Sequence, residues 1–223
     1  MAIIVALMAT LLMSALGAAL VLTTSSDALI AANFRDAQEG LYAADAALER
    51  AIAELATRAD WNAILDGSAP SAFVDGTPSG ARTLADGSPL DLGQTLNMMN
   101  CRKLTACSAS NLAATTAQRP WGPNNPVWRL FAYGPLSGLL PQHTLESAFY
   151  VIVMAADDAS ENDNDPLHDG QGDTNPGSGV LALRAEAFGP RGIRQVVEAT
   201  VARPGVPGGD PADVGVLSWR LKR

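Results

Sequence analysis

Residues 1–22, MAIIVALMATLLMSALGAALVL, form an opening segment that contains no charged side chain. As an α-helix this segment would be about 33 Å long, which matches the apolar thickness of a lipid bilayer. Most of its residues are Ala, Leu and Met, which favour helices. The segment allows three interpretations: a cleaved signal peptide, a single-pass membrane anchor, or the apolar half of a longer helix. The absence of a preceding basic residue and the length of the segment argue against the signal peptide.

The residues that follow Leu22 favour the longer helix, because no strong helix breaker appears before DGSAP at residues 66–70. An apolar stripe begins near Ile30, with members seven residues apart and small residues between them: Phe34, Leu41, Leu48 and Leu55, then Ala37, Ala44 and Ala51, with Ile52 beside them. Charged residues lie mostly off this stripe, so the pattern predicts an amphipathic helix with one buried face. We expect one continuous helix from about residue 2 to about residue 58. A coiled-coil stalk is the alternative for its second half.

The remaining sequence predicts a head made mainly of strands, punctuated by Gly, Pro, Asn and Asp. Residues 66–89 read as a long loop, and residues 95–120 carry both cysteines and a short helix. The strongest strand is Ser147–Asp158, which is apolar on both faces and is expected to be central. The other predicted strands are Trp128–Tyr133, Val180–Ala187, Ile193–Val201 and a possible last one around Leu217, Trp219 and Leu221.

These elements predict an α+β fold in which one long N-terminal helix packs on an antiparallel β-sheet head. The expected organisation is a transmembrane or fibre-core helix over 1–24, an amphipathic helix over 25–58, a globular head over 59–203, and a linker with a possible strand over 204–223. Large aromatic side chains usually lie in such a core, and we expect this of Trp61, Trp121, Trp128 and Trp219.

The charge of the chain argues against a nucleic-acid partner, because the 223 residues carry a formal net charge of −8. Most of this excess lies in one segment. Residues 157–173 hold seven acidic residues and no Lys or Arg. The chain is therefore close to neutral except for one acidic loop.

Carboxylates at short spacings, mixed with Asn and Gly, are the ligands that a hard cation such as calcium prefers. The candidate ligands in the acidic loop are Asp157, Asp158, Asp163, Asp165, Asp169 and Asp173. The loop lacks the ligand order of an EF-hand. A solvated acidic loop without a metal is the alternative interpretation, so calcium is a possible ligand and no cofactor is required.

The two cysteines, Cys101 and Cys107, favour a disulfide that closes a small loop in an oxidising compartment. Two free thiols are the alternative, and the pair is too small for a metal site on its own. The sequence contains no nucleophile elbow, zinc-protease helix or phosphate-binding loop motif. We therefore do not expect an enzyme.

The opening segment and the sequence NFRDAQEGLYAADAALERA at residues 33–51 together resemble the N-terminus of type IV pilin-like proteins, of the PilX-like minor pilin kind. The resemblance covers about the first 55 residues, and the head matches only in outline. It implies that the apolar helix is held in the inner membrane before assembly and then packs among other pilins in a fibre. It also implies that Met1 is the processed N-terminus, whose amine is methylated.

One departure from the family pattern affects the expected position in a fibre. Major pilins have Glu at mature position five, where its carboxylate pairs with the N-terminal amine of a neighbouring subunit. This chain has Val5 there, and its first acidic residue is Asp27. The resemblance therefore implies a minor subunit that initiates the fibre or lies at its tip, as the K-type pseudopilin of type II secretion is thought to do.

The sequence leaves several functions open. The main expectation is a structural minor pilin or pseudopilin in an extracellular or periplasmic fibre. The alternatives are a tip adhesin that binds through the acidic loop, a K-type pseudopilin of a type II secretion system, and a single-pass periplasmic enzyme. The partners expected in the first case are other pilins, bound through the N-terminal helix, and the inner membrane.

Overall fold

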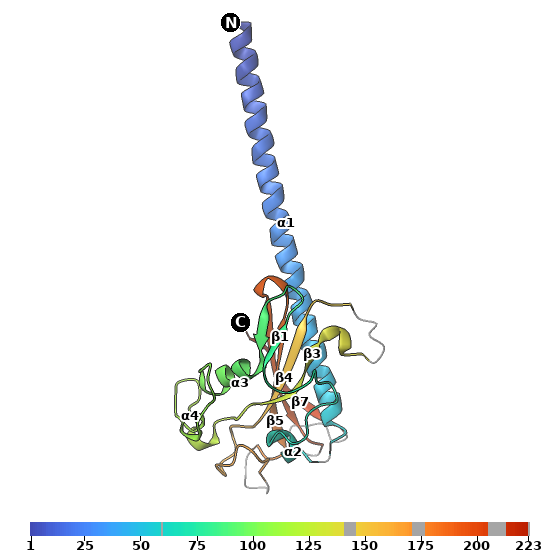
Figure 1. Ribbon diagram of the computed structural model, residues 1–223, viewed down its shortest axis with the longest axis vertical. Coiled ribbons are helices and arrows are strands. Elements are labelled where there is room, and N and C mark those ends of the chain that lie inside the picture. Colours follow the sequence, from blue (N-terminus) through green and yellow to red (C-terminus); the bar gives the residue numbers. More distant parts are fainter. Residues whose placement is uncertain (59, 141–145, 171–176, 205–212, 223) are drawn as a thin grey trace. The chain divides into compact units, whose positions relative to one another are not determined.

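The computed structural model describes residues 1–58, 60–140, 146–170, 177–204 and 213–222. The chain divides into two compact units, Met1–Glu39 and Gly40–Arg223. Helix α1, Ala2–Leu55, passes from the first unit into the second (Figure 1). The prediction of one unbroken helix is confirmed, although α1 ends three residues before the expected end near residue 58. The α+β fold class with an antiparallel sheet is confirmed as well.

Within the first unit, every residue from Met1 to Ala31 is exposed, including large apolar side chains. Leu11 is 74% exposed and Val21 is 68% exposed. The few hydroxyl groups bond to carbonyls of the same helix: Thr10 Oγ1 donates to Leu7 O at 2.9 Å, and Ser14 Oγ donates to Thr10 O at 2.8 Å. Residues 2–22 therefore present an apolar surface, and the hydroxyls of Thr10 and Ser14 need no partner from outside the helix.

The second unit is built on a five-stranded antiparallel sheet in which each strand pairs with its neighbour in the chain, in the order β3-β4-β5-β6-β7. The strands are β3 Arg129–Pro135, β4 Tyr150–Asp157, β5 Val180–Phe188, β6 Arg194–Ala202 and β7 Gly215–Lys222. All five strands were expected. The last one, which the sequence predicted only as a possible strand around Leu217, Trp219 and Leu221, is present as β7. β4 is buried at every position, but it is the second strand of the sheet, and β5 is central.

Residues Gly40–Leu55 of α1 cover one face of this sheet. Their buried side chains recur at the helical spacing of three and four residues: Ala43, Ala44, Ala47, Leu48, Ala51, Ile52 and Leu55. They share one core with alternate residues of β5, namely Leu181, Leu183, Ala185 and Ala187. The expected stripe is therefore correct for Leu48 and Leu55, while Leu41 is only partly buried. It is wrong for Phe34, which belongs to the first unit and is 67% exposed.

Glycine at position 40 allows the close approach of α1 to the sheet. A Cβ atom there would lie 2.9 Å from Phe149 Cε1 and 3.0 Å from Gln195 Cγ. Gly189 approaches the same ring so closely that its Cβ atom would lie 2.3 Å from Phe149 Cε1. Two glycines therefore make the space in which the buried Phe149 ring lies.

The other face of the sheet is covered by shorter elements. Helix α3, Leu92–Cys101, follows a small hairpin of β1, Ala81–Thr83, and β2, Pro89–Asp91. Leu90 and Leu92 pack with Ile152, Met154 and other residues of this face in a second core. The expectation of a loop over residues 66–89 is therefore incomplete, since it contains β1 and the start of β2. Figure 1 also labels the short helices α2, Asn62–Leu65, and α4, Ala109–Leu112.

Asn100 attaches α3 to the sheet through two backbone bonds. Its side-chain nitrogen donates to Trp128 O at 3.0 Å, and its Oδ1 accepts from Trp128 N at 2.8 Å. Asn100 is only 6% exposed, so both polar groups are satisfied inside the protein.

The four tryptophans divide into two pairs. Trp61 and Trp128 are 1% and 8% exposed and lie in the core, as expected. Trp121 and Trp219 are each 48% exposed, so the prediction that they anchor the core is wrong. Trp219 lies on β7 and donates from Nε1 to Asp45 Oδ1 at 2.9 Å. The alternating pattern of β7 correctly predicted a strand, but this strand lies at the edge of the sheet and stays exposed.

Candidate metal centre

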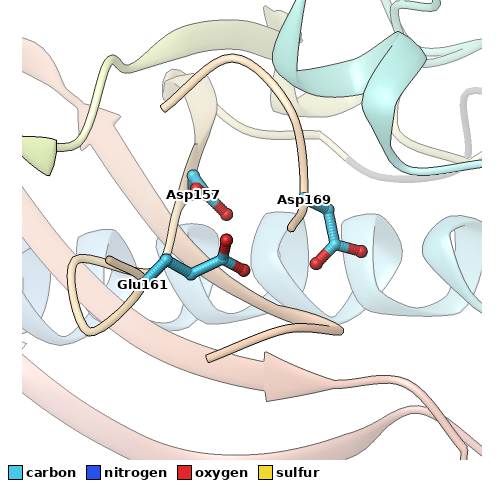
Figure 2. A group of neighbouring side chains, drawn as sticks. All are labelled: Asp157, Glu161 and Asp169. Carbon is cyan, nitrogen blue, oxygen red and sulfur yellow. The ribbon is translucent and has the colours of Figure 1, made fainter. Parts of the chain in front are cut away.

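Three buried carboxylates meet where β4 ends. Asp157 is the last residue of β4, and Glu161 and Asp169 lie in the segment that leads towards β5. One oxygen from each lies within 4.8 Å of the others. Asp157 and Glu161 are 3% exposed and Asp169 is 8% exposed. Figure 2 shows their carboxylate groups around a common space, and we call these three residues the carboxylate cluster.

Asp169 is fixed by contacts with three different segments. Its backbone N–H donates to Asn62 Oδ1 at 2.7 Å, and its Oδ1 accepts from Gly179 N at 2.6 Å. Its Oδ2 lies 3.0 Å from the guanidinium of Arg203, which is itself 4.7 Å from the centre of the Trp61 ring. The loop residue Asp169 is therefore held to α2, to the start of β5 and to the end of β6.

The buried carboxylate of Asp157 has fewer hydrogen-bond donors and positive charges around it than that of Asp169. Its Oδ1 is buried and has no hydrogen-bond partner among the described residues. Burial and the nearby negative charge of Glu161 raise the pKa of Asp157 to about 8. Burial also raises the pKa of Asp169, although the bond from Gly179 and the charge of Arg203 oppose this. Ionised carboxylates are thus costly at this position unless positive charge is supplied.

The structure brings together two of the six predicted ligands. Asp157 and Asp169 belong to the carboxylate cluster, whereas Asp158, Asp163 and Asp165 accept hydrogen bonds from backbone N–H groups two residues further on. Asp165 also lies 2.8 Å from the His168 ring. Asp173 lies outside the described residues. These local bonds place the three aspartates in turns.

Glu161 is the member of the cluster that was not predicted. It accepts a bond from Gly170 N at 2.9 Å through Oε2. A search for Asp at short spacings misses it, because it lies four residues after Asp157 and is separated from Asp169 by eight. The burial of an acidic side chain in a loop is the signal that identifies it, and burial is not visible in this sequence.

The two cysteines form a disulfide, Cys101–Cys107. Cys101 is the last residue of α3, and the chain reverses at Arg102, whose φ of 58° is left-handed. The disulfide closes this reversal and joins the following loop to the helix end. The alternative of two free thiols is therefore wrong for this structure.

A groove of about 790 Å³ opens on the side of the sheet that carries α3. Its wall includes Arg184, which forms ion pairs with both Glu186 and Glu198, and Glu186 also pairs with Arg194. The charges that line this part of the groove thus largely compensate one another. These ion pairs stabilise the surface of the sheet. They join only Arg and Glu side chains, so they do not form a pair of nucleophile and base.

Comparison with known proteins identifies the N-terminal part of the chain. Residues 1–49 match the sequence model of the family described as PilX N-terminal. No curated protein and no solved structure matched the chain. The match covers the first unit, Met1–Glu39, and residues 40–49 of α1, which belong to the second unit. It agrees with the exposed apolar side chains of residues 1–22. Residues 1–49 are therefore similar to the N-terminal segment of PilX-like type IV pilins.

Proposed function

We propose that this chain is a structural minor pilin that acts in initiation or at the tip of a type IV pilus-like fibre. The observation that carries the proposal is the exposed apolar surface of residues 2–22, in a segment that matches the PilX N-terminal family. So large an exposed apolar surface is not stable in water and requires a cover. Lipid supplies it before assembly, and neighbouring pilin helices supply it in the fibre.

The hydrogen bonds of the hydroxyl groups in α1 are compatible with both proposed surroundings of the helix, the lipid bilayer and the fibre. Thr10, Ser14, Thr23, Thr24 and Ser25 all donate to carbonyls within α1. A helix that satisfies its own polar groups can move from lipid into an apolar helix bundle without losing hydrogen bonds. The transfer exchanges one apolar neighbour for another, so its hydrophobic cost is small. The same helix can therefore act as membrane anchor and as fibre core.

The position in the fibre is proposed from charge. Residues 1–26 contain no acidic side chain, and we propose that Val5 occupies the place where major pilins have a carboxylate. Without that carboxylate, the helix cannot form an ion pair with the terminal amine of a subunit above it. A place at the tip needs no such pair. This favours an initiating or tip subunit over a repeated shaft subunit.

The first test is to shear surface fibres from cells, pellet them and quantify peptides of this chain against the major subunit by mass spectrometry. We expect the chain in the fibre fraction at a small fraction of the major subunit. Retention in the membrane fraction alone, with fibres that lack the chain, would contradict the proposal. A copy number equal to that of the major subunit would contradict the tip position.

A deletion strain separates the proposal from its alternatives. Loss of fibres that returns on complementation supports initiation. Normal fibre numbers with lost attachment would favour a tip adhesin that binds through the acidic loop. Normal surface fibres with defective protein secretion would favour a K-type pseudopilin. We propose no enzymatic activity, since the family is structural.

A further inference from the structure

We propose that Asp157, Glu161 and Asp169 bind one divalent cation of the calcium class, which fastens the segment after β4 to the head. The cluster is not an ordinary acidic loop, because its three side chains are buried. Solvated loops keep carboxylates in water, where each oxygen finds a partner. Here the carboxylate oxygens face one another inside the protein (Figure 2).

The independent observation that points to a ligand is the Oδ1 atom of Asp157. This residue is 3% exposed, and Oδ1 has no hydrogen-bond partner among the described residues. A buried carboxylate oxygen without a partner is rare, because its desolvation is costly. An ion coordinated by Oδ1 supplies the missing partner. One oxygen of each of the three carboxylates lies within 4.8 Å of the others, close enough to share an ion.

The charges of the site fit a divalent ion. The three carboxylates and the one guanidinium that pairs with Asp169, that of Arg203, have formal charges that sum to −2. Residues 171–176, which lie outside the described residues, contain no Lys or Arg in their sequence. A bound divalent cation would balance the buried charge of these four side chains.

The donor atoms favour a hard cation, and their separation allows calcium. All three donors are carboxylate oxygens, which prefer hard cations to zinc or copper. Calcium binds oxygen at about 2.3–2.6 Å, so two of its ligands lie at most about 5 Å apart. The cluster oxygens lie within 4.8 Å of one another and satisfy this limit. Magnesium, at about 2.1 Å from each oxygen, requires all separations to stay near or below 4.2 Å.

The bound ion would connect three parts of the second unit. Asp157 ends β4, whereas Asp169 is bonded to Asn62 of the α2 helix and to Gly179 beside β5. Glu161 adds the first turn of the intervening segment and accepts a bond from Gly170. The ion is thus expected to stabilise the fold around the loop. It does not need to take part in any reaction.

The test uses the full chain in a nonionic detergent, stripped of metal with a chelator. Thermal unfolding is then followed without metal, with about 2 mM Ca²⁺, and with the same concentration of Mg²⁺, which covers the Kd range of roughly 10⁻⁴–10⁻³ M typical of extracellular calcium modules. We expect calcium to raise the Tm by roughly 2–6 °C in a saturable manner. Magnesium is expected to raise it less.

Two variants distinguish the cluster from other acids of the loop. Asp157→Asn should abolish the calcium-dependent rise and, in chelator, should be as stable as the unsubstituted chain or more stable, because it removes a buried charge. Asp165→Asn, which changes an exposed acid of the same loop, should keep the full rise. If Asp157→Asn fails to fold, Glu161→Gln replaces it with the same expectation.

Three results would overturn the proposal. One is a Tm of the unsubstituted chain that is the same with and without calcium, which would mean that a protonated Asp157 satisfies the cluster. Another is an equal calcium effect in Asp157→Asn and the unsubstituted chain. The third is loss of the effect in Asp165→Asn alone, which would place the ion on the exposed loop.

Discussion

The two parts of α1 have similar compositions of Ala and Leu, yet they meet different surroundings. From Ala2 to Ala31 the side chains are exposed on every side of the helix, whereas from Gly40 to Leu55 one face is buried against the sheet. The difference lies in the distribution of charge and of small residues. The first part has no charged side chain before Asp27, and the second part confines charge to one face and places Ala and Gly on the other. Composition alone therefore does not determine what a helix contacts.

The largest expected effect comes from placing a charge in each part. Leu48→Asp puts a carboxylate at a position that is 0% exposed, so it should lower the free energy of unfolding of the second unit by at least about 3 kcal/mol. Chemical denaturation followed by tryptophan fluorescence measures this, because Trp61 lies in the same core.

Leu12→Asp is the matched substitution in the first part, where Leu12 is 62% exposed. It should leave the unfolding of the second unit unchanged and weaken membrane insertion by about 2.5–3.5 kcal/mol. Carbonate extraction of membranes measures the second effect. If Leu12→Asp instead destabilised the head, the two parts of α1 would not be independent.

The two glycines of α1 provide a smaller and sharper test. Gly40→Ala should destabilise the second unit by about 1–3 kcal/mol, because the new methyl group meets the Phe149 ring. Gly17 has no neighbour within 4 Å, so Gly17→Ala should only favour the helix, by up to about 1 kcal/mol. Denaturant titration of both variants compares them. Equal effects of the two substitutions would mean that Phe149 moves aside freely.

The two parts of α1 should also contribute differently to the pH dependence of stability, because the first 26 residues have no acidic or basic side chain. In the second part, burial alone would raise the pKa of Glu54, but hydrogen bonds from Ser71, Arg58 and the Ala72 N–H outweigh it and lower the pKa. A carboxyl whose pKa is lower in the folded state than in the unfolded state stabilises the fold when the pH is above the unfolded-state pKa. This stabilisation disappears as the pH falls through the folded-state pKa.

Glu54→Gln should therefore lower the Tm near neutral pH, and its difference from the unsubstituted chain should shrink between about pH 5 and pH 3. Thermal unfolding over this range measures it. Glu49→Gln, at an exposed position of the same helix, is the control. A difference that grows on acidification would show that the bonds to Glu54 do not form in solution.

The smallest effect is expected from Ser14→Ala in the first part. Among the described residues, the Ser14 hydroxyl bonds only to Thr10 O of its own helix, so its removal should change stability and membrane retention by less than about 0.5 kcal/mol. Quantitative immunoblotting of membrane fractions checks this. A clear loss of membrane retention or of fibres would mean that Ser14 contacts a neighbouring subunit.

Much of the fold could be predicted because helix and strand periodicities are local. The stripe through Leu48 and Leu55 and the alternation through Trp219 both identified their elements correctly. Phe34 was assigned to the buried stripe because its spacing is right, but spacing does not show where the sheet begins to cover the helix. The β1–β2 hairpin was missed because each strand has three residues, too few for a pattern.

The candidate site was predicted only in part for a similar reason. Asp157 and Asp169 were among six candidates, and the sequence could not rank them because all six lie in one acidic segment. Bonds to Asn62 and Gly179 select Asp169, and Asn62 is distant in the chain. Glu161 was missed since only its burial separates it from the other acids. Tertiary contacts thus decide which members of the loop meet.

The sheet order β3-β4-β5-β6-β7 has a consequence for how the protein folds. Each strand pairs with the strand just before it in the chain, so every pairing step closes a local loop. Such topologies fold faster than those with long-range pairings. A chain whose strands emerge from a membrane in sequence order can therefore assemble its head hairpin by hairpin, on the part of α1 that precedes them. The long α1 precedes all five strands and is present before the first of them needs a surface on which to pack.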